Sequence, residues 1–180
     1  KSTNAMYDHY CTLAGQVFGL ISLVLCVLAF SSKQDERLFV LLLSANVAFA
    51  LQFAFFGSWT AAALSLLVIA RICLAHHYPR NISVMAAILV VSGLASVLTW
   101  QSWSDLPAII AMILGTVGMF LLRGIPIRVF LGLAALSWMA SHIIAGSVGG
   151  TLAEALVLVA NAITIYRIYI TGKRYLDVVD

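Results

Sequence analysis

Charged side chains are scarce in this sequence. Lysine, arginine, aspartate and glutamate make up 9% of the residues and hydrophobic types make up 63%, whereas a soluble domain carries about 25% charged residues. So few charges cannot cover a surface that faces water. The composition therefore excludes a soluble globular domain and predicts an integral membrane protein surrounded by lipid. The net charge of +3 is too small to indicate a nucleic-acid partner.

Cysteine is also rare, and we find no catalytic motif. Cys11, Cys26 and Cys73 lie far apart without any CxxC or Cys/His spacing, so we expect packing residues and no metal site. The sequence contains no nucleophile–base pair with a third orienting group and no glycine-rich phosphate loop. The polar segments are too short to hold an enzyme's chemistry. We therefore expect a protein that is not an enzyme and uses no cofactor.

Apolar segments of helix length fill most of the chain. A bilayer core about 30 Å thick needs about 20 apolar helical residues. Polar, glycine and proline breaks leave seven such segments, at residues 12–30, 37–56, 59–77, 82–100, 106–122, 127–145 and 150–171. Every break is short, so consecutive helices should be antiparallel neighbours. The sequence predicts an all-α membrane protein with seven transmembrane helices.

Basic residues alternate between the breaks. They occur in the first, third and fifth breaks and after the last helix, and the other breaks have none. These residues are Lys33, Arg37, Arg80, Arg123, Arg128, Lys173 and Arg174. Trp59, Trp100 and Trp103 lie at the breaks without basic residues, as interfacial anchors do. Because basic loops stay in the cytoplasm, the N-terminus should lie outside and the C-terminus in the cytoplasm of a multi-pass plasma-membrane protein.

The two halves of the chain resemble each other. The stretch FSSKQDERLF at 30–39 aligns with LLRGIPIRVF at 121–130, and SLLVIARI at 65–72 aligns with NAITIYRI at 161–168. The first three helices would then recur as the last three, with the fourth as a linker that inverts the chain and makes the repeats parallel. This 3+1+3 pattern predicts a three-helix bundle at 7–78, a linker helix at 79–104 and a second three-helix bundle at 105–175.

The arrangement resembles the SWEET and PQ-loop transporter superfamily. The stretch AGSVGGTLAE at 145–154, with N and YR downstream, and FFGSW at 55–59 are similar to the bacterial inner membrane protein YgjV family. The resemblance implies this fold, an inner-membrane location and a transporter class of activity. The chain has no Pro-Gln pair, so it departs from the PQ-loop pattern, and neither a proline hinge nor a sugar substrate carries over.

Ionisable side chains inside the predicted spans are candidate site residues, because they are costly in hydrocarbon. Glu154 lies about one turn into the last helix, and His142 lies about as far before the GSVGG turn, so the two should reach similar depth. Such a pair could form a proton relay or a substrate clamp. The alternative for Glu154 is a capping box with Thr151, in which the carboxylate binds the amide of its own N-cap. The alternative for His142 is a hydrogen bond that closes the hairpin.

Two asparagines lie near the predicted middle of the membrane. Asn161 is about 15 Å past Thr151 along its helix, and Asn46 has a similar depth. Asn161 shares a helix face with Glu154, and Ser65 is its partner in the repeat alignment. These residues could bind a solute at the midplane between the repeats. The alternative is interhelical hydrogen bonding, worth about 0.6–2 kcal/mol.

The remaining candidates lie nearer the helix ends. Gln16 and Gln52 add polar groups to the outer half, and Trp138 lies on the face of its helix that carries the histidine. Arg71 and Arg167 are equivalent in the repeat alignment and lie toward the cytoplasmic ends, where they could snorkel to the interface or form an inner gate.

The sequence thus predicts a transporter that moves a small polar solute by alternating access between two bundles. The predicted binding residues are Asn161, Asn46, Glu154, His142, Trp138, Ser65, Gln52 and Gln16, and the predicted gating residues are Arg71 and Arg167. A non-transporting scaffold, receptor or assembly factor of the same fold stays open, as does a proton-coupled carrier of amino acids or metabolites. The expected partners are membrane lipid and a small-molecule solute, and a homo-oligomer is left open.

Overall fold

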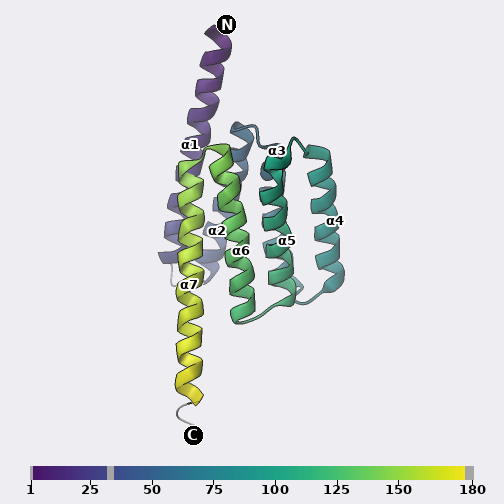
Figure 1. Ribbon diagram of the computed structural model, residues 1–180, viewed down its shortest axis with the longest axis vertical. Coiled ribbons are helices and arrows are strands. Elements are labelled where there is room, and N and C mark those ends of the chain that lie inside the picture. The colour runs from purple at the N-terminus through teal and green to yellow at the C-terminus, as the bar shows by residue number, and fades with distance from the viewer. Residues whose placement is uncertain (1, 32–34, 177–180) are drawn as a thin grey trace.

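The computed structural model describes residues 2–31 and 35–176, which are helical almost throughout (Figure 1). The elements are α1 (Ser2–Ser31), α2 (Asp35–Phe55), α3 (Trp59–His77), α4 (Ile82–Thr99), the 3-10 helix η1 (Trp103–Asp105), α5 (Leu106–Leu121), α6 (Ile125–Ala145) and α7 (Val148–Leu176). Each apolar segment corresponds to one of the seven α-helices, so the all-α prediction is confirmed. Two helices are longer than predicted, because polar residues mark the end of an apolar run and do not end a helix. α1 already includes Asp8, and α7 continues beyond the predicted end at residue 171 to Leu176.

Among the described residues, six helices are long and apolar enough to cross a membrane. The candidate spans are Met6–Ala29, Trp59–His77, Ile82–Thr99, Trp103–Leu121, Ile125–Ala145 and Val148–Thr171. In α2 the apolar part found among the described residues is the shorter segment Val40–Phe55. Apolar side chains also face outward. Val97 and Leu98 of α4 are 77% and 85% exposed, as suits contact with lipid.

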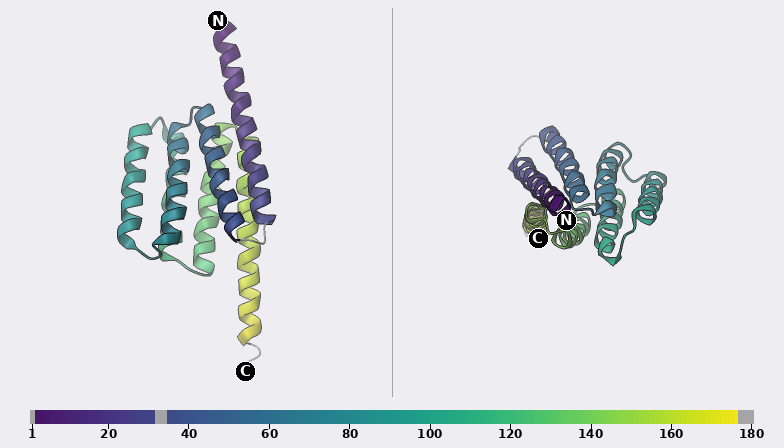
Figure 2. Two further views of the ribbon diagram at one scale, coloured as in Figure 1. Left: turned by 180° about the vertical axis from the view of Figure 1, so that it is seen from behind. Right: turned by 90° about the horizontal axis from the view of Figure 1, so that it is seen from above.

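Six of the helices form a ring. α1 packs against α2 and α7, and the ring continues through the pairs α2–α3, α3–α5, α5–α6 and α6–α7. α4 packs on the outside, against α3 and α5 (Figure 2). Consecutive helices are therefore neighbours, as the short breaks predict. The ring is the part of the fold that positions the candidate site.

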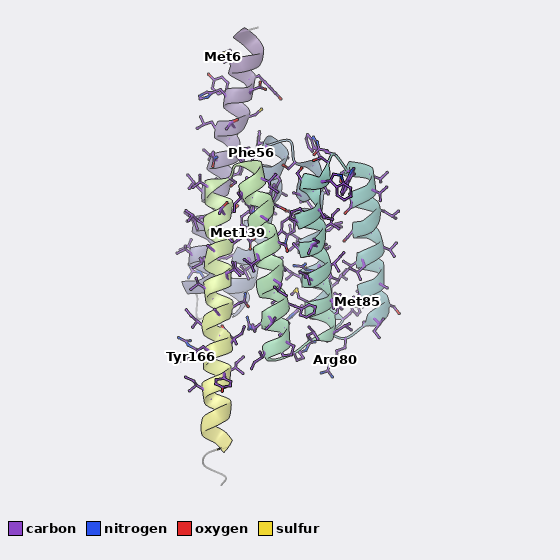
Figure 3. The ribbon with its side chains drawn as sticks, in the orientation of Figure 1. Met6, Phe56, Arg80, Met85, Met139 and Tyr166 are labelled. Carbon is purple, nitrogen blue, oxygen red and sulfur yellow. The ribbon has the colours of Figure 1, made fainter. Side chains whose placement is uncertain are left out.

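The helix turns fall at two ends of the molecule (Figure 1). The α3–α4 and α5–α6 turns lie at the end from which the C-terminus extends, and we name this the basic end after Arg80 and Arg123. The α2–α3, α4–α5 and α6–α7 turns lie at the opposite end with the N-terminus, and we name this the tryptophan end after Trp59, Trp100 and Trp103. Arg80 and Phe56 mark the two ends in Figure 3.

Two turns at the tryptophan end have the same glycine cap. After α2, Gly57 adopts a φ of 72°, and the Ser58 amide donates to the Phe53 carbonyl at 2.9 Å. After α6, Gly146 adopts a φ of 80°, and the Ser147 amide donates to the carbonyl of His142 at 2.9 Å. A left-handed residue after the last helical turn favours glycine. The repeated Gly-Ser pair thus has one structural cause in both turns.

Candidate functional site

A cavity of about 440 Å³ lies inside the ring. Side chains from all six ring helices line it, whereas no described residue of α4 does. Along α6 the lining extends from Arg128 in the first turn to His142 in the last, a length of about 21 Å. The cavity therefore follows the ring axis from near the tryptophan end to near the basic end.

The cavity brings together most of the residues that the sequence singles out. Seven of them line it, namely Asn46, Ser65, Arg71, Trp138, His142, Glu154 and Asn161. Three others do not. Gln16 and Gln52 bind the α6–α7 region at the tryptophan end, and Arg167 is exposed on α7. The predicted residues that line the cavity thus come from four different helices.

Two opposite charges enter this space from different helices. Arg71 of α3 is 6% exposed and Glu154 of α7 is 8% exposed. The two groups act on each other electrostatically, yet no hydrogen bond or ion pair within 4.0 Å joins them. A buried charge needs a close partner to offset its lost hydration. Arg71 and Glu154 are therefore free to bind a polar molecule in the cavity.

The Arg71 guanidinium packs against a defined position on α5. Its Nη1 donates to the Met112 sulfur at 3.7 Å, and its Nε has no partner. The guanidinium lies against Gly115, where a Cβ atom would overlap it. Arg71 therefore does not snorkel to the interface, because a missing side chain on α5 leaves room for it inside the ring.

The capping-box alternative for Glu154 is wrong. α7 begins at Val148, so Thr151 already lies within the helix, where its hydroxyl donates to the carbonyl of Ser147 at 2.7 Å. Ser147 supplies the cap instead, since its Oγ accepts from the amide of Gly150 at 3.0 Å. Glu154 makes no hydrogen bond with any described residue, and its carboxylate faces the cavity. The sequence reading placed the helix start too late because the GG pair resembles a break.

His142 is held by Gln52. The Gln52 Nε2 lies 2.8 Å from the imidazole Nδ1, and the hydroxyl of Ser147 donates to the Gln52 Oε1 at 2.8 Å. With the amide donating, Nδ1 accepts and the ring proton of a neutral imidazole lies on Nε2. Phe53 stacks on the ring with centroids 4.5 Å apart, and Phe49 packs beside it at 4.9 Å. His142 therefore pairs with Gln52 and does not form the predicted hydrogen-bonded pair with the carboxylate of α7.

The GSVGG sequence packs three helices together at the tryptophan end. A Cβ atom on Gly149 would overlap the backbone of Gly19 in α1, and one on Gly150 would overlap the His142 ring. Gln16 ties α1 to the turn, since its Nε2 donates to the Gly146 carbonyl at 2.6 Å and its Oε1 accepts from the Val148 amide at 3.2 Å. We name the four polar side chains that fasten this end the closing cluster. Its members are Gln16, Gln52, His142 and Ser147.

Neither asparagine joins two helices. The Nδ2 atoms donate within their own helices, from Asn161 to the Val157 carbonyl at 3.0 Å and from Asn46 to the Leu42 carbonyl at 2.9 Å. The Asn161 Oδ1 is buried without a partner. The interhelical-bond alternative is therefore wrong for both residues among the described hydrogen bonds, and both side chains line the cavity.

Sequence reasoning missed Arg128 and Ser147. Arg128 was assigned to a break, but it is half-buried and lines the cavity. Helical spacing carries the signal that could have found it, because the α6 lining residues 128, 131, 134, 135, 138 and 142 recur at separations of three and four, which places them on one face of the helix. Ser147 had no such signal, since its partner Gln52 lies far away in the sequence.

The matches to known proteins extend over nearly the whole helical region. The family Imp-YgjV, described as bacterial inner membrane protein, matches residues 13–171. The inner membrane protein YgjV of Escherichia coli (strain K12) is 27% identical over 163 residues, which cover 90% of this chain and 88% of that relative. No solved structure matches the chain. The matched range contains every residue of the cavity and of the closing cluster.

Proposed function

The chain belongs to the Imp-YgjV family of bacterial inner membrane proteins, and on that premise we propose that it is a transporter. It moves a small polar solute across the inner membrane by alternating access. The observation that carries the proposal is the cavity inside the ring, where Arg71 and Asn161 present buried polar atoms without hydrogen-bond partners and Glu154 makes no hydrogen bond with a described residue. Such atoms are costly at membrane depth unless water or a ligand satisfies them.

In this proposal the moving parts are two parallel three-helix repeats, α1–α3 and α5–α7, with α4 as the linker. The helix contacts support it, because the pairs α1–α2 and α2–α3 recur as α5–α6 and α6–α7, and α3–α5 recurs as α7–α1. The equivalent caps at Gly57 and Gly146 support it too. The arrangement resembles the SWEET and PQ-loop superfamily, and a site between repeats is typical of such carriers.

The proposal assigns the structure to the state that faces the cytoplasm. The closing cluster seals the tryptophan end, and the cavity extends toward the basic end as far as Arg128. The positive-inside rule assigns the basic end to the cytoplasm and the N-terminus to the outside. Alternating access then requires the closing cluster to separate. The proposal involves no enzymatic step, cofactor or metal, and one copy of the chain suffices because it contains both repeats.

Thiol labelling tests the proposal. In a chain whose three native cysteines are replaced by alanine, Ala160→Cys introduces a thiol into the cavity lining. Ile163→Cys is the matched control, because Ile163 of the same helix is outward and exposed. A charged, membrane-impermeant thiol reagent is applied to right-side-out and to inverted membrane vesicles. We expect Ala160→Cys to react from both sides and Ile163→Cys from neither, because lipid shields it.

A non-transporting scaffold, receptor or assembly factor gives a different result. Its cavity has no need to open at the tryptophan end, so Ala160→Cys would react from one side at most. This outcome would overturn the transporter proposal and favour the scaffold.

A further inference from the structure

We propose that the solute is a small zwitterion with an apolar side chain, bound between Arg71 and Glu154; this inference rests on the proposed function. Its carboxylate pairs with the Arg71 guanidinium, and its ammonium group pairs with the Glu154 carboxylate. The chemical class is that of aliphatic and aromatic α-amino acids.

The first argument is the placement of the two charges. α3 contacts α2, α4 and α5, whereas α7 contacts α1 and α6, so the two charged helices are not neighbours in the ring. Arg71 and Glu154 thus reach the cavity from different sides of it. Each side chain is more than nine-tenths buried, and neither forms an ion pair with a described residue. A ligand that carries both charges can bridge them.

The second argument is what other ligands would leave unpaired. A simple cation would pair with Glu154 but add repulsion at Arg71, and a simple anion would do the reverse. Leaving one buried charge without a partner is strongly unfavourable. Arg128, which also lines the cavity, is only half-buried near the basic end, so water can solvate it. Of the simple charge patterns, only the zwitterion satisfies both deep charges together.

The third argument is the rest of the lining. Asn161 lies two helical turns from Glu154 on the same face of α7, and its unpartnered Oδ1 can accept a hydrogen bond from an ammonium group. Val68, Ile72 and Leu131 are among the apolar residues of the wall, and they fit a hydrocarbon side chain. The volume of about 440 Å³ equals that of about 15 water molecules, which leaves room for an amino acid with some water.

Uptake by proteoliposomes tests the inference. The purified chain is reconstituted, and uptake of labelled L-leucine, L-isoleucine, L-methionine and L-phenylalanine is measured against empty liposomes. The comparison probes are 4-methylpentanoate, which lacks the ammonium group of leucine, 3-methylbutylamine, which lacks its carboxylate, and glucose, which has neither. We expect uptake of at least one amino acid, with each comparison probe slower by about tenfold or more, because each loses a charge-assisted hydrogen bond.

Charge-removing variants test the two assigned contacts. In Glu154→Gln we expect the preference for leucine over 4-methylpentanoate to fall by about tenfold, because the ammonium group no longer has an anionic partner. In Arg71→Gln the preference for leucine over 3-methylbutylamine should fall similarly. Arg80→Gln is the matched control, because Arg80 is exposed in the turn after α3 and does not line the cavity, and it should leave both preferences unchanged. If Arg71→Gln fails to fold, Glu154→Gln alone still tests whether the solute is a zwitterion.

The outcomes separate this inference from the proposed function. Uptake of glucose, the acid or the amine without uptake of any of the four amino acids overturns the zwitterion and leaves a transporter. Labelling of Ala160→Cys from both sides without uptake of any probe also overturns only the zwitterion. No uptake, with Ala160→Cys reactive from one side alone, overturns both.

Discussion

Gly150 of α7 lies against the imidazole of His142 on α6, so closely that a Cβ atom at this position would overlap the ring. Gly115 of α5 makes the same kind of room for the Arg71 guanidinium. Two polar groups of the cavity thus owe their positions to side chains that are missing on neighbouring helices. Protein interiors are close-packed, so these glycines are part of the site even though they have no polar side chain.

Replacing Gly150 should therefore disturb the closing cluster. We expect Gly150→Ala to push the His142 ring from Gln52 and to lower the free energy of unfolding by about 1–3 kcal/mol, as overpacking does. Thermal unfolding in detergent is the measurement. Gly132→Ala is the control, because nothing lies within 4 Å of a Cβ atom there, and the change should be neutral or stabilising by up to about 1 kcal/mol. Equal effects of the two changes would contradict the assigned contact.

Gly149 and Gly115 should respond differently to alanine. A Cβ atom on Gly149 meets the backbone of Gly19, which cannot turn aside, so Gly149→Ala should separate α1 from α7 and lower the unfolding temperature markedly. A Cβ atom on Gly115 meets the flexible end of Arg71, so Gly115→Ala should fold and lose solute uptake. The measurements are thermal unfolding and proteoliposome uptake. A Gly115→Ala protein with full uptake would show that the packing of the Arg71 guanidinium against Gly115 has no role in solute binding.

Ser147 should matter more than its size suggests. Ser147→Ala removes the cap of α7 and leaves the buried Gln52 Oε1 without a donor. The loss of a cap costs about 0.5–2 kcal/mol, and an unsatisfied buried acceptor adds about 1–3 kcal/mol. Ser137→Ala removes only a bond to the carbonyl of Leu133 in its own helix and should cost much less. Thermal unfolding of the two variants side by side checks this order.

Glu154 and Asp105 provide a pair of carboxylates with opposite roles. The Asp105 Oδ2 accepts from the amides of Gln101 at 2.7 Å and Ser102 at 3.2 Å, so Asp105→Ala should lower stability by about 0.5–2 kcal/mol. Glu154→Gln breaks no hydrogen bond with a described residue, so it should lower stability less than Asp105→Ala does, while solute selection changes. A stability loss in Glu154→Gln as large as that in Asp105→Ala would restore a structural role for this carboxylate.

The sequence predicts the helices well because apolar length and short breaks are local signals. It also selects Glu154, Asn161 and Asn46 correctly as residues inside the ring, since membrane depth can be counted along a helix. Their binding role stays a prediction. The family resemblance carried by AGSVGGTLAE is confirmed by the match over residues 13–171.

The contacts between helices could not be predicted in the same way. The bond from Gln52 to His142 and the approach of Gly149 to Gly19 depend on how far one helix is shifted and rotated against another. No local pattern in the sequence encodes that register. For the same reason the sequence suggested a His142–Glu154 pair. The two residues lie at similar depth, but their helices are rotated so that the side chains do not pair.

The position of α4 has a consequence for how the cavity could arise. If α1–α3 and α5–α7 are duplicated units, two separate copies of one such unit would form a pore whose opposing walls are chemically identical. α4 crosses the membrane once more, joins the two units in one polypeptide and gives them the same orientation in the membrane. Each wall can then mutate independently, so a guanidinium on one side can face a carboxylate on the other, an arrangement that a symmetric pair of identical subunits cannot produce.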